Sequence, residues 1–340
     1  MANLRPQSNI VALTYTKEAA YGTAVADGSI TKLYDLMEPT LAEVSQEMTY
    51  DEEMIKGHEF PIDTAYNVIT SNDVTIPLSF WASPEICGLL FAAALGSIST
   101  SGPVSTIYTH TITAMATTTT DQPASLSLVE AVKGETSTYK KYKGVIPNEV
   151  KLSCENRGRI SVTASCFSDG NIGDASAFSL PSTKETINPL FGKDAVFAIS
   201  DAGGSPATQA TVLRGFEFTW NNNLSREDNR AMINAGVDLT SLRLGAARNC
   251  TLTCKIQGSK SSQYFTDWRA KTLKFVKITM ASGTKSVIID INRCLITDVK
   301  DSFDGIRNVL EVTFKPYTTT TSTVTPVTIT VANLLTGYML

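Results

Sequence analysis

The sequence predicts a mainly β protein built from two tandem β-sandwich or barrel-type domains, each with one flanking α-helix. Two observations carry this prediction. Short segments alternate apolar and polar residues, which is the period of a strand with one buried face. The order of these segments, with one helix among them, occurs twice along the 340 residues. Such a repeat indicates an internal duplication.

The first pair of corresponding strands carries its apolar residues on one face. Val44 and Met48 share one face of the earlier strand, and Phe216, Phe218 and Trp220 share one face of the later strand. Matching Val44 with Phe216 gives an offset of 172 residues between the two copies.

Three further pairs follow in the same order. The second pair has an offset of 176 residues and the last two have an offset of 150. The drop coincides with extra residues 95–120 in the first copy, where we expect inserted loop, because loops tolerate insertions better than strands. The matched residues are Val74, Ile76, Leu78 and Phe80 with Cys250, Leu252, Cys254 and Ile256; Leu126 and Leu128 with Val276 and Ile278; and Ile160–Ala164 with Leu310–Phe314.

One helix is expected in each copy. Ile86–Leu95 reads ICGLLFAAAL, which is too short to span a membrane and is typical of a core helix. Ser83 before Pro84 suits an N-cap followed by the first turn. The second helix is expected at about 261–269, where Tyr264, Phe265 and Trp268 have helical spacing.

The pattern divides the chain into five parts. We expect long polar connections between strands at 50–73 and 221–249, at equivalent places in the two copies. The parts are an N-terminal arm at 1–29, a first β domain at 30–169, a linker at 170–187, a second β domain at 188–316, and a Thr-rich C-terminal segment at 317–340 with a last strand at 327–331.

Composition limits the classes of function. The net charge of −4 argues against a basic outer surface that grips nucleic acid, but it does not exclude a DNA conduit whose wall repels phosphate. No export signal or membrane-spanning apolar run is present in the sequence given, so we expect the six cysteines to be reduced.

No residue pattern indicates catalysis or metal binding. Cys250 and Cys254 on one strand would lie roughly 13 Å apart, too far to share an ion. The two histidines, His58 and His110, are expected in loops or strand ends with no Cys or His nearby. The chain is therefore expected to be no enzyme and to use no cofactor or metal.

A group of three aspartates could suggest a calcium loop. Asp298, Asp301 and Asp304 follow one another at three-residue spacing, but the segment lacks the glutamate and the spacing of an EF-hand. A polar hairpin between two strands is the favoured interpretation.

Five segments together resemble the tail tube proteins of long-tailed bacteriophages, also called major tail proteins, in the variety with two tube domains per chain. The resemblance covers about residues 12–316 and includes no catalytic motif. The segments are Lys17–Thr23, Leu41–Met48, Val74–Leu95, Tyr142–Gly144 and Val150–Ser153.

The resemblance implies a structural virion protein of the tail. Such domains join side by side into rings, and the rings stack into a tube through which DNA reaches the host. It implies contact with a tape-measure protein and transiently with DNA in the lumen, with tail terminator and baseplate proteins at the ends, and assembly in the host cytoplasm. The duplication itself suggests three chains per ring, which gives pseudo-hexameric symmetry.

The resemblance also directs attention to two groups of charged residues. The long connections would reach the neighbouring ring, and opposite charges there would fix register. Acidic residues on polar strand faces would line the lumen. The inter-ring candidates are Asp51, Glu52, Glu53, Arg226, Glu227, Asp228 and Arg230, and the lumen candidates are Glu43, Glu47, Glu217 and Glu311.

Two other classes of protein remain open. The chain could be another tandem β-sandwich virion protein, such as a capsid decoration or tail fibre subunit. A carbohydrate-binding module is less favoured, because such modules expose aromatic residues, whereas Trp81, Trp220 and Trp268 are expected in the core.

Overall fold

The computed structural model confirms a mainly β chain with two α-helices. It describes residues 9–38, 42–50, 67–115, 122–132, 139–174, 178–182, 184–209, 213–226, 243–244, 247–257, 263–304, 307–318 and 325–339.

The elements fall in two sets along the chain. The first set is β1 (Asn9–Leu13), β2 (Lys32–Asp35), β3 (Glu43–Tyr50), β4 (Asn67–Trp81), α1 (Pro84–Leu95), β5 (Gly96–Val104), β6 (Ile107–Ala114), β7 (Leu126–Val132), β8 (Lys140–Glu155), β9 (Ser161–Phe167) and β10 (Ile172–Asp174). The second set is β11 (Ala195–Asp201), β12 (Ala207–Thr208), β13 (Leu213–Asn221), β14 (Leu224–Ser225), β15 (Arg243–Leu244), β16 (Asn249–Gln257), α2 (Gln263–Ala270), β17 (Lys274–Ser282), β18 (Lys285–Asp304), β19 (Arg307–Pro316) and β20 (Val327–Asn333).

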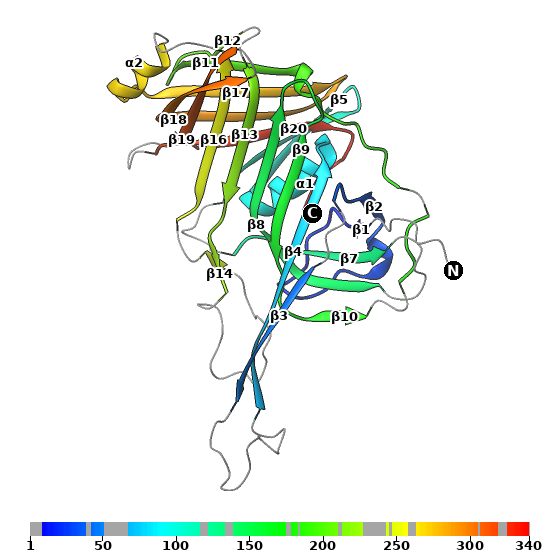
Figure 1. Ribbon diagram of the computed structural model, residues 1–340. Coiled ribbons are helices and arrows are strands. Elements are labelled where there is room, and N and C mark those ends of the chain that lie inside the picture. Colours follow the sequence, from blue (N-terminus) through cyan, green and yellow to red (C-terminus); the bar gives the residue numbers. More distant parts are fainter. Residues whose placement is uncertain are drawn as a thin grey trace, which may run out of the picture.

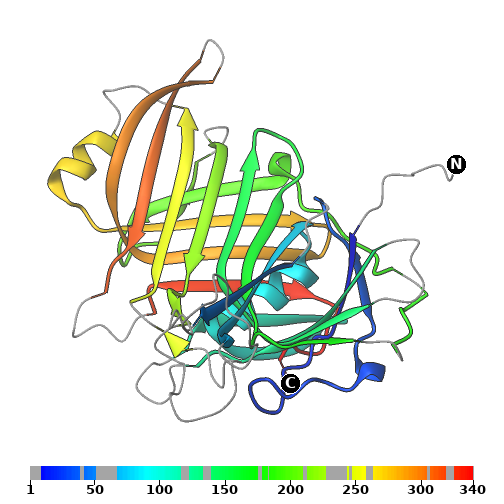
Figure 2. The ribbon, with the colours of Figure 1, turned by 60° about the horizontal axis from the view of Figure 1, so that its bottom comes forward.

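The main feature is a continuous antiparallel sheet of eight strands. Its order is β3-β4-β9-β8-β13-β16-β19-β18. The first four strands come from one set and the last four from the other, in matching order. Figure 2 shows them side by side, from the cyan and blue strands to the orange ones. We call this the junction sheet, since the pairing of β8 with β13 joins its two halves.

A second layer packs against the junction sheet. The long strands β8 and β18 bend out of the junction sheet and pair with β7 and β17. In the first set, β7 pairs with β1, and β1 pairs with β2. In the second set, β17 pairs with β11, and β11 pairs with β12. Figure 1 shows the strands of this layer running across those of the junction sheet. Each set of strands therefore makes the same two sheets in the same order.

Strand pairing corrects the offsets expected between the two copies. Val44 lies opposite Val74 and Trp220 lies opposite Cys250, so Val44 corresponds to Trp220 with an offset of 176, not 172. The last strands also differ by two residues, since the partner of Phe80 is Val162 and the partner of Ile256 is Leu310. Both errors are even numbers, because a shift of two or four leaves every side chain on the same face.

The third pair of strands carries the same two-residue error. Leu126 pairs with β8 at a register shift, and Lys274 pairs with β18 at the same kind of register shift. Leu126 therefore corresponds to Lys274, with an offset of 148 residues.

The inserted residues of the first copy form a hairpin, not a loop. Strands β5 and β6 pair with each other, and β6 pairs with β20, which pairs with β18. The expectation of an inserted loop was wrong, as was the placement of His110 at a strand end. The alternation of Ile112 with threonines gives β6 one buried and one polar face. The C-terminal strand β20, expected from its alternation, is confirmed and ties this hairpin to the second copy.

Helix α1 is confirmed as a core helix. Only Glu85 among its residues is not buried, and the helix contacts β8, β6, β20 and β18. The Ser83 hydroxyl accepts a bond from the Ile86 amide at 3.3 Å and Pro84 opens the helix, as expected. A helix that is apolar all round requires burial on every side.

Helix α2 is shorter and lies at the surface. It packs on β18, as Figure 1 shows at the upper left. Trp268 is 36% exposed and its indole nitrogen donates to the Thr297 carbonyl at 3.2 Å, so its expected core position was wrong. Trp220 is buried as expected, and Trp81 is half-buried.

Two polar segments are strand where connections were expected. Strand β3 continues to Tyr50, and strand β4 begins at Asn67. The two ends of the connection expected at 50–73 therefore belong to paired strands, which form a hairpin arm. Figure 1 shows this arm extending away from the sheet. Asp298 and Asp301 lie within β18 and not in a turn. Continued backbone pairing with the neighbouring strand overrides the low strand propensity of these residues.

Strand β16 has the two faces that its alternation predicted. Cys250, Leu252, Cys254 and Ile256 are buried, and the intervening Thr251 is half-buried on the other side. All six cysteines are free and buried. Burial raises the pKa of the Cys166 thiol to about 12 and raises the pKa of Cys254 further. These thiols are therefore packing groups with little thiolate at neutral pH.

We predict that Cys254→Ser lowers the free energy of unfolding by about 1–3 kcal/mol, because it buries a hydroxyl among apolar neighbours. Denaturant unfolding followed by circular dichroism would measure the change. Thr251→Ser, on the opposite face of β16, is the matched control and should change stability far less. Rapid thiol labelling of Cys254 in the native protein would contradict the placement.

Candidate assembly interface

The junction sheet has one apolar and one polar face. Residues on the apolar face are buried against the second layer, as in β9 and β16, where every second residue is buried. We call the opposite side the polar face. It carries serine, threonine, lysine and glutamate side chains that are exposed or half-buried.

Three of the four lumen candidates share the polar face. Glu217 and Glu43 are exposed, and Glu311 is half-buried opposite Lys255 and Lys300. Glu47 belongs to β3, but its side chain lies outside the described residues.

The residues predicted from the sequence for this face are all glutamates and do not include its lysines. Lys151 Nζ lies 2.6 Å from Glu217 Oε2, which joins β8 to β13. Lys255 Nζ reaches Glu155 Oε1 at 2.8 Å across β13, and holds the pKa of Glu155 below its usual value. Exposed pairs like these add little stability, but they favour one register. Considering every polar-face position, not the acids alone, would have revealed them.

Gly215 leaves space for the ion pair between Lys255 and Glu155. It lies in β13 directly between Glu155 and Lys255. A Cβ at Gly215 would lie 3.0 Å from the Cys154 carbonyl oxygen and 3.7 Å from Lys255 Cδ. The absence of a side chain therefore leaves room for the lysine to cross the strand.

Asn222 fastens the two copies on the buried side of the junction. Its side-chain amide donates to the carbonyls of Ala94 at 2.8 Å and Pro147 at 3.0 Å. Its oxygen accepts from the Trp220 indole at 3.0 Å. A fully buried amide with these partners fixes the position of β13 relative to α1 and β8.

Arg226 also bridges the copies. Its guanidinium donates to the Val74 carbonyl at 3.0 Å and to Thr75 Oγ1 at 2.8 Å, and it lies 3.8 Å from the centre of the Phe167 ring. Any contact with a neighbouring ring would compete with these bonds. The other inter-ring candidates, Asp51, Glu52, Glu53, Glu227, Asp228 and Arg230, lie outside the described residues, as does His58.

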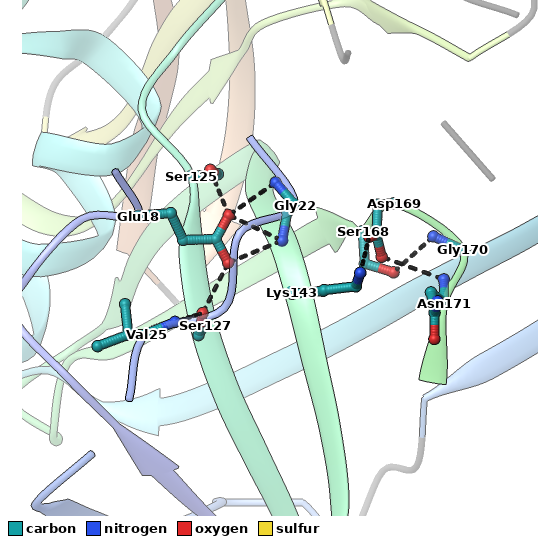
Figure 3. A network of polar contacts seen from close by, with 11 residues as sticks. Glu18, Gly22, Val25, Ser125, Ser127, Lys143, Ser168, Asp169, Gly170 and Asn171 are labelled. Carbon is teal, nitrogen blue, oxygen red and sulfur yellow. Dashed lines mark hydrogen bonds and ion pairs between the residues drawn. The ribbon is translucent and has the colours of Figure 1, made fainter. Parts of the chain in front are cut away.

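Glu18 anchors the N-terminal segment to the first copy (Figure 3). Its buried carboxylate accepts from the hydroxyls of Ser125 and Ser127 at 2.7 and 2.6 Å. It also accepts from the amides of Gly22 at 3.0 Å and Gly144 at 2.9 Å. Four donors compensate for the desolvation of this charge. The Lys17–Thr23 segment, one of the segments that carry the resemblance, therefore has a structural role: it holds the N-terminal segment against the first copy.

A buried histidine fastens the C-terminal strand. His110 Nε2 lies 3.2 Å from Asn333 Oδ1, and Nδ1 lies 2.9 Å from Thr100 Oγ1. The Leu335 amide donates to the same Asn333 oxygen, which fixes this atom as an acceptor. The neutral His110 ring therefore carries its proton on Nε2 and donates it to Asn333. The Tyr338 ring packs on His110 edge to face.

Tyr338 docks the C-terminal end on α1. Its hydroxyl donates to the Pro84 carbonyl at 3.2 Å and contacts the Asn333 amide. A Cβ at Gly88 would overlap the Tyr338 ring, so this position of α1 needs glycine.

The described residues contain no cluster of three His, Cys, Asp or Glu that could hold a metal ion. Neither described helix is long and apolar enough to cross a membrane.

Comparison with known families agrees with this geometry. A family model described as phage tail tube protein matches residues 8–331. The match covers nearly the whole chain, and the chain therefore belongs to the phage tail tube protein family. No curated protein matched this chain.

We predict that the melting temperature falls between pH 7 and pH 5 through His110. Burial lowers the pKa of His110 below its ordinary value of 6.5. Well above pH 6.5 the ring is neutral in both the folded and the unfolded state. As the pH falls, the unfolded chain takes up the proton first, so stability is lost until the pH reaches the folded pKa.

Thermal melts of the wild type and of His110→Gln would test this. The His110 variant should show a smaller change in melting temperature between pH 7 and pH 5 than the wild type. Equal changes in the two proteins would contradict the assignment.

Proposed function

We propose that this tail tube family member polymerises into stacked rings, each of three chains, which form the tube that conducts DNA from the virion. The pairing of β8 with β13 carries the proposal. It joins two equivalent four-stranded units edge to edge in one sheet. A chain that makes this contact once internally has, at the two ends of its sheet, the same pair of edges to offer to other copies.

Closing these edges has a clear physical benefit. Among the described residues, β3 pairs only with β4, and residues 298–304 of β18 pair only with β19. Exposed strand edges favour uncontrolled association, and closing a ring removes them. Two units per chain and three chains give pseudo-sixfold symmetry, and head-to-tail stacking of rings gives an open filament.

In such a ring the polar face would line the lumen. Threonine, serine and paired charges offer DNA phosphates few free cations. The acidic and basic groups at Glu217 and Lys151 neutralise each other. This supports a wall that DNA can slide past, although it is less uniformly acidic than the glutamates alone suggested.

The domain limits and stacking contacts belong to the same proposal. The two tube domains would be residues 30–169 and 188–316, and β1 would belong with the first because it pairs with β7. The segments expected as long connections, at 50–73 and 221–249, would reach the next ring. A tape-measure protein in the lumen, and terminator and baseplate proteins at the ends, would complete the tail, with assembly in the host cytoplasm. A capsid decoration or fibre subunit is the second candidate among virion proteins, but the family match favours the tube.

Electron microscopy of the purified protein tests the stoichiometry. We expect rings or tubes whose averaged cross-section contains three chains and six similar lobes. Six chains per ring would contradict the role of the internal junction. Isolated elongated particles under all conditions would contradict tube formation altogether.

Replacing Glu217 and Glu311 by lysine should make assembled tubes bind DNA at low salt, because each added lysine can release condensed counterions. Filter binding of short duplex DNA to purified tubes would measure this, with Glu217→Gln and Glu311→Gln as the control. Binding should weaken steeply as salt rises. Lysine tubes that bind no more DNA than the glutamine tubes would show that these residues do not face the lumen.

A further inference from the structure

We propose that residues 298–300 of β18 pair antiparallel with residues 43–45 of β3 in a second copy of this chain, in the register that places Lys300 opposite Glu43. The inference rests on the proposed function and names its contact surfaces. It takes the internal contact between β8 and β13 as the template for the contact between chains.

The mapping of β8 onto β18 is fixed by two irregularities. Both strands have a register shift at the bend, where Val145 and Cys294 pair with Leu126 and Lys274. Both have a second shift nearer the junction, directly after Pro147 in β8 and after Ile296 in β18. Each comparison gives the same offset, so Lys151 corresponds to Lys300. Two independent shifts exclude the even-numbered errors that alternation alone permits.

The mapping of β13 onto β3 follows from their shared neighbour. Thr219 lies opposite Thr251 in β16, and Glu43 lies opposite Thr75 in β4. Thr219 therefore corresponds to Glu43. In the internal junction Lys151 lies opposite Thr219. The same register between chains places Lys300 opposite Glu43, and Asp298 opposite Ser45.

Exposure of apolar side chains marks the same two edges. Val44 is 51% exposed, whereas its counterpart Trp220 in the closed junction is 5% exposed. Phe303 is 72% exposed, whereas its counterpart Cys154 is 4% exposed. Large apolar side chains on the core-facing side of both free edges indicate surfaces that a partner covers. The partner that fits both edges is the chain itself.

Charge also favours this pairing. Within one chain Lys300 contacts Asp298 at 2.7 Å, and both lie at the surface. Glu43 is exposed on the opposite edge of the sheet. Opposite charges directly across an antiparallel pair stabilise it, and like charges destabilise it. The lysine that occupies the equivalent place in the internal junction, Lys151, also pairs with a glutamate of the facing strand.

Charge reversal tests the register. Lys300→Glu and Glu43→Lys should each raise the protein concentration needed for ring or tube formation by about tenfold or more, and the double variant should restore assembly. Sedimentation velocity would measure assembly, and thermal melts would confirm that each chain folds. Lys315→Glu, exposed on the same face but in β19, is the matched control and should assemble normally.

Directed cross-linking provides a second test that does not depend on stability. Ser45→Cys with Asp298→Cys should give covalent multimers on oxidation, since directly opposite residues have Cβ atoms about 5 Å apart. Ser45→Cys with Ser302→Cys should not, because the new thiols would be roughly 13 Å apart. The native cysteines are all buried and should not interfere.

The outcomes separate this inference from the proposed function. Normal assembly of both charge-reversed single variants, or equal cross-linking of both cysteine pairs, would overturn the register while leaving tube formation intact. A wild-type chain that forms no ring or tube would overturn the proposed function and the inference with it.

Discussion

The structure depends on one constraint: backbone groups at a strand edge need partners. The chain meets it internally by pairing β8 with β13, which makes two four-stranded units into one sheet. Asn222 fixes this contact on the buried side, and the Lys151–Glu217 pair accompanies it on the polar side. Among the described residues, β3 pairs with β4 alone and residues 298–304 of β18 pair with β19 alone, and the proposed contact between chains falls at these two edges.

The remaining elements keep the junction sheet rigid enough to act as a building block. Helix α1 fills the space between the layers, and β20 binds the inserted hairpin of the first copy to the second copy. Glu18 and His110 use buried hydrogen bonds to hold the two ends of the described chain against this body. Buried polar contacts with every partner in place favour a single arrangement over many similar ones. In the proposed stack of rings, such rigidity would prevent small errors in each ring from accumulating along the stack.

Much of the fold could be predicted from the sequence, because alternation and capping are local. The paired faces of β16 and the Ser83-capped helix α1 both follow from neighbouring residues alone. Register could not be predicted, since alternation has a period of two and the mismatches of two and four residues preserve each face. The bond between His110 and Asn333 joins residues 223 positions apart, and no local pattern announces it. The lysines of the polar face were visible in the sequence, but only strand order shows which glutamates they meet.

Hydrogen exchange before and after assembly tests the central claim most directly. Backbone amides of residues 43–45 and 298–300 that point away from the neighbouring strand should exchange rapidly in the isolated chain and become protected in tubes. Amides in the β8–β13 junction should be protected in both states, because that contact is already closed. If tubes form while residues 43–45 and 298–300 stay as exposed to exchange as in the isolated chain, the internal junction is not the template for assembly.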